Sequence, residues 1–179
     1  YSPEDPIEKW LFDTLVLDAE PAELDERDLE DIKDKKLLFK EKDLEELFTN
    51  EKELRDYIGI YIYAHYRNRP KDLAFLADAP HHKAFVVYTE RGMKIVSSIQ
   101  AAIEGGLSNE LVNSIYRERK DYHGHLIPHA MIIHQRMPKF GKLKGLRIVR
   151  IATHPDVMRM GIGSFALEKL CEYASERKY

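Results

Sequence analysis

The sequence predicts an α/β fold of the α+β type, in which N-terminal helices precede paired strands and a final strand–helix unit. Apolar residues recur every three or four positions in residues 7–17 and 54–62, as expected for amphipathic helices. From Lys83 the apolar period shortens to two, which is typical of strands. Residues 147–174 combine a β-branched run, a glycine-rich turn and another helical pattern.

Length and composition narrow the class of protein. The 179 residues suffice for one domain with a sizeable core, and 44% hydrophobic with 33% charged residues indicate a soluble globular protein. A single cysteine excludes an internal disulfide and a cysteine-based zinc site. No apolar run approaches the roughly 18 residues of a membrane span, and the acidic start does not resemble a signal peptide. We therefore expect a cytoplasmic protein with no membrane partner.

The N-terminal part is predicted to be helical. Pro6 opens the first apolar pattern, and proline is favoured in the first helical turn. Residues 19–36 are rich in charge and predict a solvated helix or linker. Asp43 is the predicted N-cap of a short helix. Residues 51–69 predict a long aromatic helix whose tyrosine stripe is assigned to the core rather than to base stacking.

The middle of the chain changes from helices to strands. Residues 83–103 predict two antiparallel strands joined by a polar turn, and Gly105–Gly106 end the second strand. Ser108 is the predicted N-cap of the helix that follows. Residues 120–145 show no period and predict an irregular segment.

The C-terminal stretch predicts a phosphate site. Ile148–Ile151 suit a half-buried strand, and Gly161 and Gly163 lie at the start of a helical pattern. The first N–H groups of a helix have no intrahelical partner and lie at the positive end of its dipole. A strand that passes through such a turn therefore offers backbone donors to a phosphate.

Two common phosphate motifs fit this turn poorly. A P-loop requires Lys and then Ser or Thr after its last glycine, whereas Ser164 and Phe165 follow Gly163. The dinucleotide fingerprint places its glycines directly after the strand, but seven residues separate Ala152 from Met160. A strand–loop–helix turn with incidental glycines is the remaining alternative.

The turn resembles motif A of the GNAT acetyltransferases, in which Q/R-x-x-G-x-G/A opens a helix after a strand and a loop. Met158, Gly161 and Gly163 occupy the motif positions, with methionine replacing the usual Gln or Arg. The resemblance implies that the loop amides hold the pyrophosphate of acetyl-CoA and that the strand end holds its pantetheine arm and thioester. The implied cofactor-binding residues are Ile151, Ala152, Thr153, Met158, Arg159, Met160, Gly161, Ile162, Gly163 and Ser164.

Five stretches resemble the RNA cytidine acetyltransferase family more narrowly. In chain order they are PIEKWLFDTLVLDA, AHYRNRPKDLAFLADAPHHKAFVV, IQAAIEGGLS, GHLIP and GLRIVRIATHPDVMRMGIGSFALEKL. The resemblance implies an archaeal-type member with a partial GNAT fold and a helical N-terminal extension. Residues 1–50 would form a helical, acidic connecting region, and residues 51–179 a GNAT domain truncated after the motif-A helix. The rest of a parent polypeptide, with a helicase-like module that binds ATP, is then an expected partner.

The same resemblance implies transfer of acetyl from acetyl-CoA to the exocyclic amine of cytidine in tRNA or rRNA, which gives 4-acetylcytidine. His82 aligns with a family histidine considered important for catalysis, and histidine titrates near neutral pH, so it is the first candidate base. Glu104 is the second, because GNAT enzymes often draw a base through water from that region. A hydrogen-bonding role for His82 in its turn is the alternative. Acyl transfer of this kind requires no metal.

Charge is distributed unevenly along the chain. Residues 1–56 carry 20 Asp and Glu against 9 Lys and Arg, whereas residues 117–150 carry 9 Lys and Arg against two acidic residues. The basic segment is predicted to hold RNA phosphates, with a solvated loop as the alternative. The candidate RNA-binding residues are Arg136, Lys139, Lys142 and Lys144. A GNAT enzyme acting on protein or small-molecule amines, and a non-catalytic assembly module, are the alternative functions.

Overall fold

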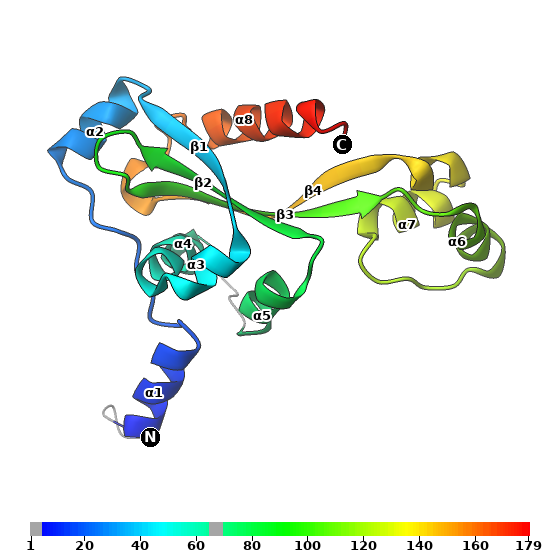
Figure 1. Cartoon of the computed structure of the whole chain (residues 1–179), viewed down its shortest axis with the longest axis horizontal. Coiled ribbons are helices and arrows are strands. Elements are labelled where there is room, and N and C mark those ends of the chain that lie inside the picture. Colours follow the sequence, from blue (N-terminus) through cyan, green and yellow to red (C-terminus); the bar gives the residue numbers. More distant parts are fainter. Residues whose placement is uncertain (1–4, 65–69) are drawn as a thin grey trace.

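The protein is built around a four-stranded antiparallel sheet with the strand order β1-β2-β3-β4 (Figure 1). The structure is a computed structural model that describes residues 5–64 and 70–179. The predicted mixture of helices and paired strands is confirmed. The strands are β1 (Leu37–Lys42), β2 (His82–Thr89), β3 (Ile95–Gly105) and β4 (Lys144–Thr153).

Helices cover both faces of the sheet (Figure 1). Helices α3, α4 and α5 lie on one face and α8 lies on the other, while α6 and α7 form a lobe at the far end of the β3–β4 ribbon. No helix in the described ranges is long and apolar enough to cross a membrane. The α-helices are α1 (Pro6–Thr14), α2 (Glu26–Lys33), α3 (Leu44–Thr49), α4 (Glu51–Ala64), α5 (Pro70–Asp78), α6 (Asn109–Asn113), α7 (Leu126–Ile133) and α8 (Ile162–Glu176).

Local signals in the sequence explain where several helices begin. The side chain of Asp43 accepts the N–H of Glu46 at 2.9 Å, and Ser108 Oγ accepts the N–H of Leu111 at 3.2 Å. Both satisfy donors that the first turn of a helix leaves unpaired. The two predicted N-caps are therefore confirmed.

Tyr57 and Tyr61 of α4 belong to the core, as predicted, whereas Tyr63 is exposed. Tyr57 is fully buried, and its hydroxyl donates to the carbonyl oxygen of Ile99 at 2.9 Å. Ser98 Oγ returns a hydrogen bond to the carbonyl oxygen of Tyr57 at 3.0 Å. Burying side chains of this size contributes about 1.5–3 kcal/mol each, so α4 is held firmly on β3.

Two elements depart from the sequence prediction. Strand β1 was not expected, because only the first three residues of LLFKEK are apolar; its pairing with β2 makes it a strand. Residues 120–145 are not irregular throughout, since they contain α7 and a 3₁₀ helix at Pro138–Lys142. Helix α7 has the sequence LIPHAMII, which is almost wholly apolar and so shows no amphipathic period.

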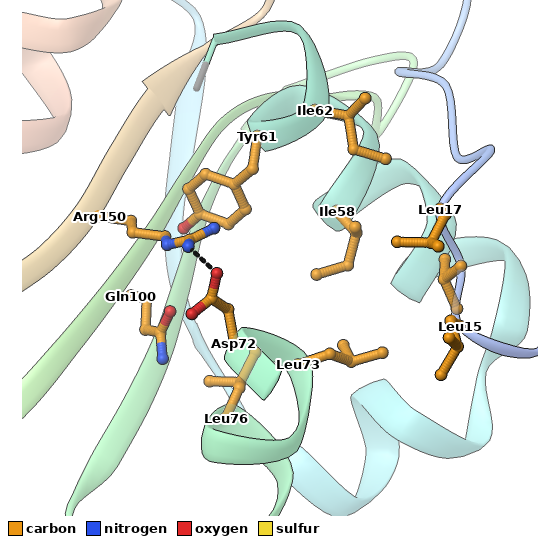
Figure 2. Close-up of a pocket in the computed structure, with 11 residues that line it drawn as sticks. Leu15, Leu17, Ile58, Tyr61, Ile62, Asp72, Leu73, Leu76, Gln100 and Arg150 are labelled. Atoms are coloured by element: carbon orange, nitrogen blue, oxygen red, sulfur yellow. Dashed lines mark hydrogen bonds and ion pairs between the residues drawn. The ribbon is translucent and has the colours of Figure 1, made fainter. Parts of the chain in front are cut away.

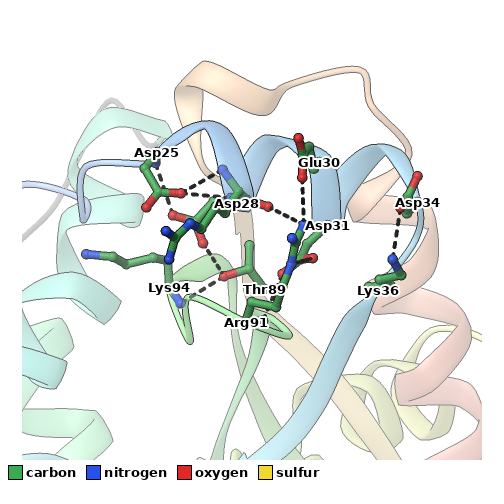
Figure 3. Close-up of polar contacts among 10 residues, drawn as sticks. Asp25, Asp28, Glu30, Asp31, Asp34, Lys36, Thr89, Arg91 and Lys94 are labelled. Atoms are coloured by element: carbon green, nitrogen blue, oxygen red, sulfur yellow. Dashed lines mark hydrogen bonds and ion pairs between the residues drawn. The ribbon is translucent and has the colours of Figure 1, made fainter.

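The acidic N-terminal stretch is anchored to the sheet rather than fully solvated (Figure 3). Asp31 on α2 is completely buried and accepts the N–H of Arg91 at 2.8 Å and its Nε at 2.6 Å. Thr89 Oγ1 donates to Asp28 Oδ1 at 2.6 Å. These contacts fasten α2 to the β2–β3 turn.

Candidate functional site

The turn between β4 and α8 leaves the start of a helix open. Gly161 is the N-cap of α8, with a φ of 84° and no side-chain cap hydrogen bond. A residue with a Cβ would cost about 1–2 kcal/mol in this left-handed conformation, which explains the glycine. The N–H groups of Ile162, Gly163 and Ser164 have no acceptor within the helix. They form a donor set suited to a phosphate, at the positive end of a 15-residue helix.

An open cleft lies directly against this turn. Every predicted cofactor-binding residue lines the cleft except Met160. Sequence reasoning missed four other lining residues: two come from α4, whose place beside the turn depends on tertiary packing, and two lie in the same stretch as the turn but outside the motif. The missed residues are Tyr63, Ala64, Pro155 and Leu167.

Gly163 keeps the cleft open beside the end of β4. A Cβ placed on Gly163 would lie 3.6 Å from Thr153 Oγ1, which is an ordinary van der Waals contact. The fold of this chain therefore tolerates a methyl group at position 163. A longer side chain there would compete with whatever occupies the cleft.

A buried histidine supports the loop that leads to the turn. His154 is 2% exposed, and its Nε2 lies 2.9 Å from the carbonyl oxygen of Ala22. The N–H of Asp156 donates to His154 Nδ1 at 3.3 Å. A carbonyl oxygen only accepts, so Nε2 carries the proton and Nδ1 accepts. The ring is thus fixed by a donor on one side and an acceptor on the other.

Strand β4 contains a β-bulge next to the cleft. Arg150 of β4 pairs with Gln100 of β3, and the next pair joins Ile148 to Ala101. Val149 therefore has no paired residue on β3. A bulge changes the face on which the following side chains lie. Arg150 forms an ion pair with Asp72 of α5 on one face, while Ile148 and Ile151 pack into the core with α8 on the other.

His82 lies at the first residue of β2 and contacts β3 through its side chain. Its Nδ1 is 2.8 Å from Gln100 Nε2, and its ring meets the ring of His81 edge-on with centroids 4.7 Å apart. Burial lowers the pKa of His82, and the nearby His81 and Arg147 lower it further, although Glu104 opposes them. The neutral imidazole is therefore favoured near pH 7.

The structure does not bring His82 into the cleft at the turn. His82 instead lines a shallow hollow with residues 41–45 and Lys83. Phe85 of β2 lies in line with Ile151 of β4 across the sheet. His82 is three residues before Phe85, which places it about 10 Å along the strands and about 10 Å across them from Ile151. Bound substrates would have to span this separation to contact both His82 and the cleft.

Glu104 is a buried carboxylate at the end of β3 and is 2% exposed. Its Oε2 accepts the N–H of Ile127 in the first turn of α7 at 2.9 Å, and its Oε1 accepts Nε of Arg147. The N–H of Gly105 donates to His125 Nδ1 at 3.1 Å. Both carboxylate oxygens are therefore engaged in holding α7 and β4 to β3.

A group of three polar residues, which the sequence did not predict, lies beside His82 and is joined to it through Gln100. Gln100, Arg150 and Asp72 line a largely apolar cavity between α4, α5 and β3 (Figure 2). The guanidinium of Arg150 also lies 6.0 Å from the centre of the Tyr61 ring. A glutamine in the middle of an apolar strand pattern was the signal available in the sequence.

The four predicted RNA-binding residues lie close together in the chain and are all exposed. Arg136 stacks its guanidinium 5.5 Å from the centre of the Tyr116 ring, and Lys142 Nζ donates to Asn109 Oδ1. None of the four forms an ion pair with a carboxylate in residues 5–64 or 70–179. Their charge therefore remains available to an anionic partner.

The described part of the chain contains no group of three or more His, Cys, Asp or Glu residues that could hold a metal ion. The histidines at 123, 125, 129 and 134 thus do not gather into a site. His125 and His129 instead make local contacts with Gly105, Lys120 and Asp121.

Known proteins are similar to this chain over most or all of its length. Residues 56–179 match the family described as GNAT acetyltransferase 2. The chain is 50% identical over its whole length to a protein of Methanopyrus kandleri named tRNA(Met) cytidine acetyltransferase TmcA, and covers 21% of that protein. It is 53% identical over 99% of its length to the protein of the same name from Thermococcus kodakarensis, of which it covers 22%. The chain thus spans about a fifth of the length of these relatives.

Among solved structures, an aminoglycoside acetyltransferase from an uncultured soil metagenomic sample aligns with a TM-score of 0.48 and 12% identity. The alignment covers 82% of this chain and 74% of that one.

Proposed function

This chain belongs to the GNAT acetyltransferase 2 family, and we propose that it binds acetyl-CoA and takes part in acetylating the exocyclic amine of cytidine in RNA. The observation that carries the proposal is the uncapped start of α8, which opens into the cleft at the end of β4. The names of the relatives from Methanopyrus kandleri and Thermococcus kodakarensis support cytidine in tRNA as the acceptor.

The residues present fit acetyl-CoA at this position. The N–H groups of Ile162, Gly163 and Ser164 would hold the pyrophosphate, and the guanidinium of Arg159 would add charge at the rim of the cleft. Strand β4 is the last in the sheet, so its outer edge meets no further strand within the described residues. An edge strand offers unpaired N–H and C=O groups, which suit the amides of a pantetheine arm.

The reaction requires one proton to move. The amine nitrogen of cytidine attacks the thioester carbonyl carbon, the C–S bond breaks, and the proton lost from the amine is balanced by the proton gained by the thiolate of CoA. A neutral histidine suits the first step, and His82 is kept neutral by its lowered pKa. Glu104 is the weaker candidate because Arg147 and Ile127 engage both of its oxygens.

RNA must present an unstacked cytidine, because a paired base hides its amine. The exposed charges of Arg136, Lys139, Lys142 and Lys144 support binding of the phosphate backbone. Use of ATP by another part of a longer polypeptide, and a cytoplasmic location, remain predictions from the sequence.

One observation favours a different acceptor. The hollow beside His82 is lined by three carboxylates and two lysines, one of them paired with Glu41, so a small excess of negative charge remains; the charged residues are Glu41, Lys42, Asp43, Glu45 and Lys83. Negative charge repels phosphate but attracts a cationic amine. Acetylation of a lysine or a small amine is therefore the second candidate function, and the assay below includes it.

The test places this chain in the context of a whole relative. Residues 1–179 would replace the matching fifth of the Thermococcus kodakarensis protein, and the chimera would be incubated with acetyl-CoA, ATP and unmodified tRNA. Mass spectrometry of the digested RNA should detect 4-acetylcytidine, which should fall at least tenfold with Gly163→Glu or His82→Ala. Acetylation of an added polyamine or lysine peptide without any 4-acetylcytidine would favour the second candidate.

A further inference from the structure

Gln100 is a buried polar side chain at the centre of the sheet. It is 4% exposed, and its neighbours across the sheet are Ala84 on β2 and Arg150 on β4. Its side chain reaches diagonally to the first residue of β2, where Nε2 lies 2.8 Å from Nδ1 of His82. Buried polar side chains in proteins are usually hydrogen-bonded, so this contact accounts for an amide at a buried position of β3.

The chemistry of the two groups restricts the proton on the ring. An amide nitrogen donates and does not accept. With Gln100 Nε2 facing it, Nδ1 of His82 must therefore accept, and the neutral ring carries its proton on Nε2. A ring with its proton on Nε2 offers an N–H to its surroundings and has no lone pair there with which to take up a proton.

We propose that Gln100 is a positioning residue that decides which ring nitrogen of His82 carries the proton, and that in this structure it holds the proton on Nε2. Rotating the Gln100 amide by 180° would bring its Oε1 to Nδ1 of His82. Because that oxygen only accepts, Nδ1 would then carry the proton and Nε2 would have a free lone pair. Gln100 therefore determines whether His82 donates a hydrogen bond or acts as a base. The consequence for acetyl transfer rests on the proposed function, whereas the position of the ring proton does not.

The Gln100 contact also bears on the charge of the ring. An imidazolium carries hydrogen on both nitrogens, so its Nδ1–H would meet the N–H donor of Gln100. The contact thus disfavours the charged ring, in the same direction as burial, His81 and Arg147, which lower the pKa of His82, and against Glu104, which raises it. The Gln100 amide must rotate before the ring can take up a proton without placing two N–H donors against each other.

The test is long-range ¹H–¹⁵N NMR of the labelled 179-residue chain, which distinguishes the two neutral tautomers and the imidazolium. His82 signals would be assigned by their loss in His82→Asn. His154 provides an internal reference in every variant, because Ala22 and Asp156 fix its ring independently of Gln100. Ser98→Ala, which removes another buried polar group of β3 that does not contact His82, is the matched control.

In the wild-type chain we expect the neutral His82 ring to carry its proton on Nε2. Gln100→Leu removes the constraint and should give a mixture of tautomers. Gln100→Glu supplies a group that only accepts, so the proton should move to Nδ1 and the pKa of His82 should rise by about one unit or more. Ser98→Ala should leave the ring unchanged.

A wild-type ring with its proton on Nδ1 would overturn the proposal, as would identical ring states in the wild type, Gln100→Leu and Gln100→Glu. If loss of the His154 reference signals shows that a variant is unfolded, the wild-type spectrum and the other variant decide. None of these spectra depends on acetyl-CoA. A failure of the chain to bind acetyl-CoA would therefore refute the proposed function while leaving this assignment intact.

Discussion

Nε2 of His154 donates to the carbonyl oxygen of Ala22, 132 positions earlier in the chain, at a distance of 2.9 Å. This bond joins the loop before the candidate acetyl-CoA turn to the segment that precedes α2. The turn therefore depends on residues outside the part of the chain that matches the GNAT acetyltransferase 2 family, which begins at residue 56.

Replacing His154 tests this dependence. His154→Ala leaves the carbonyl of Ala22 and the N–H of Asp156 without their partner and opens a cavity, so the free energy of unfolding should fall by about 2–4 kcal/mol. Urea denaturation followed by circular dichroism measures the change. His134→Ala, at an exposed histidine, is the control and should stay within about 0.5 kcal/mol of the wild type. Equal effects of the two variants would show that the bond is not structural.

The contact between Asp31 and Arg91 predicts a dependence of stability on pH. Hydrogen bonds from the N–H and side chain of Arg91 hold the pKa of Asp31 below its usual value. The ionised form is thus favoured in the folded state, and the stabilisation is present above the unfolded pKa of about 4 and is lost as the pH falls below it.

Asp31→Asn should therefore destabilise the protein at pH 7, and the difference from the wild type should shrink as the pH falls through and below about 4. Urea midpoints at several pH values measure it. Asp34→Asn alters an exposed pair with Lys36 and should change little at any pH. A wild-type advantage over Asp31→Asn that is constant down to pH 3 would contradict the mechanism.

Glu104 is predicted to hold the α6–α7 lobe to the sheet. Glu104→Gln keeps an oxygen for the N–H of Ile127 but loses the charge that pairs with Arg147, so we expect a loss of about 1–3 kcal/mol. Hydrogen exchange of the α7 amides should increase. Glu110→Gln, an exposed carboxylate on α6, should change neither. Unaltered stability and exchange in Glu104→Gln would remove the structural role and strengthen the case for Glu104 as a base.

The basic segment predicts how RNA binding depends on salt. Reversing the charge of Lys139, Lys142 and Lys144 to Glu should weaken binding of tRNA and reduce the slope of log K against log salt by about two to three. Reversing three exposed lysines of the acidic N-terminal region, Lys33, Lys35 and Lys40, changes the net charge equally and is the control. Filter binding at several salt concentrations compares the two triple variants, and equal slopes would contradict a specific role.

The features that the sequence predicted correctly are those with local causes. The N-caps at Asp43 and Ser108, the β2–β3 hairpin and the β4–α8 turn each depend on residues within a few positions of one another. Strand β1 depends on pairing with β2, which lies 52 positions further along the chain at Leu37 and 42 positions at Lys42. The sequence of β1 itself shows little alternation.

The candidate site divides in the same way. The turn that we propose to bind phosphate is contiguous in the sequence, and the structure gathers all of its predicted residues except Met160 in one cleft. The contact of His82 with Gln100 depends on the register between β2 and β3. The ion pair of Arg150 with Asp72 depends on the β-bulge at Val149. No local pattern records a register or a bulge, so these contacts required the structure.

Acetyl-CoA binding to the 179-residue chain, measured by isothermal titration calorimetry, tests the central claim most directly. Gly163→Ala and Gly163→Glu form a matched pair, because a Cβ at position 163 makes only an ordinary contact with Thr153. We expect the wild type to bind, Gly163→Ala to bind within about fivefold, and Gly163→Glu to bind at least tenfold more weakly, since its carboxylate would block and repel the pyrophosphate. Equal affinity of the wild type and a folded Gly163→Glu variant would contradict the placement of acetyl-CoA at the start of α8.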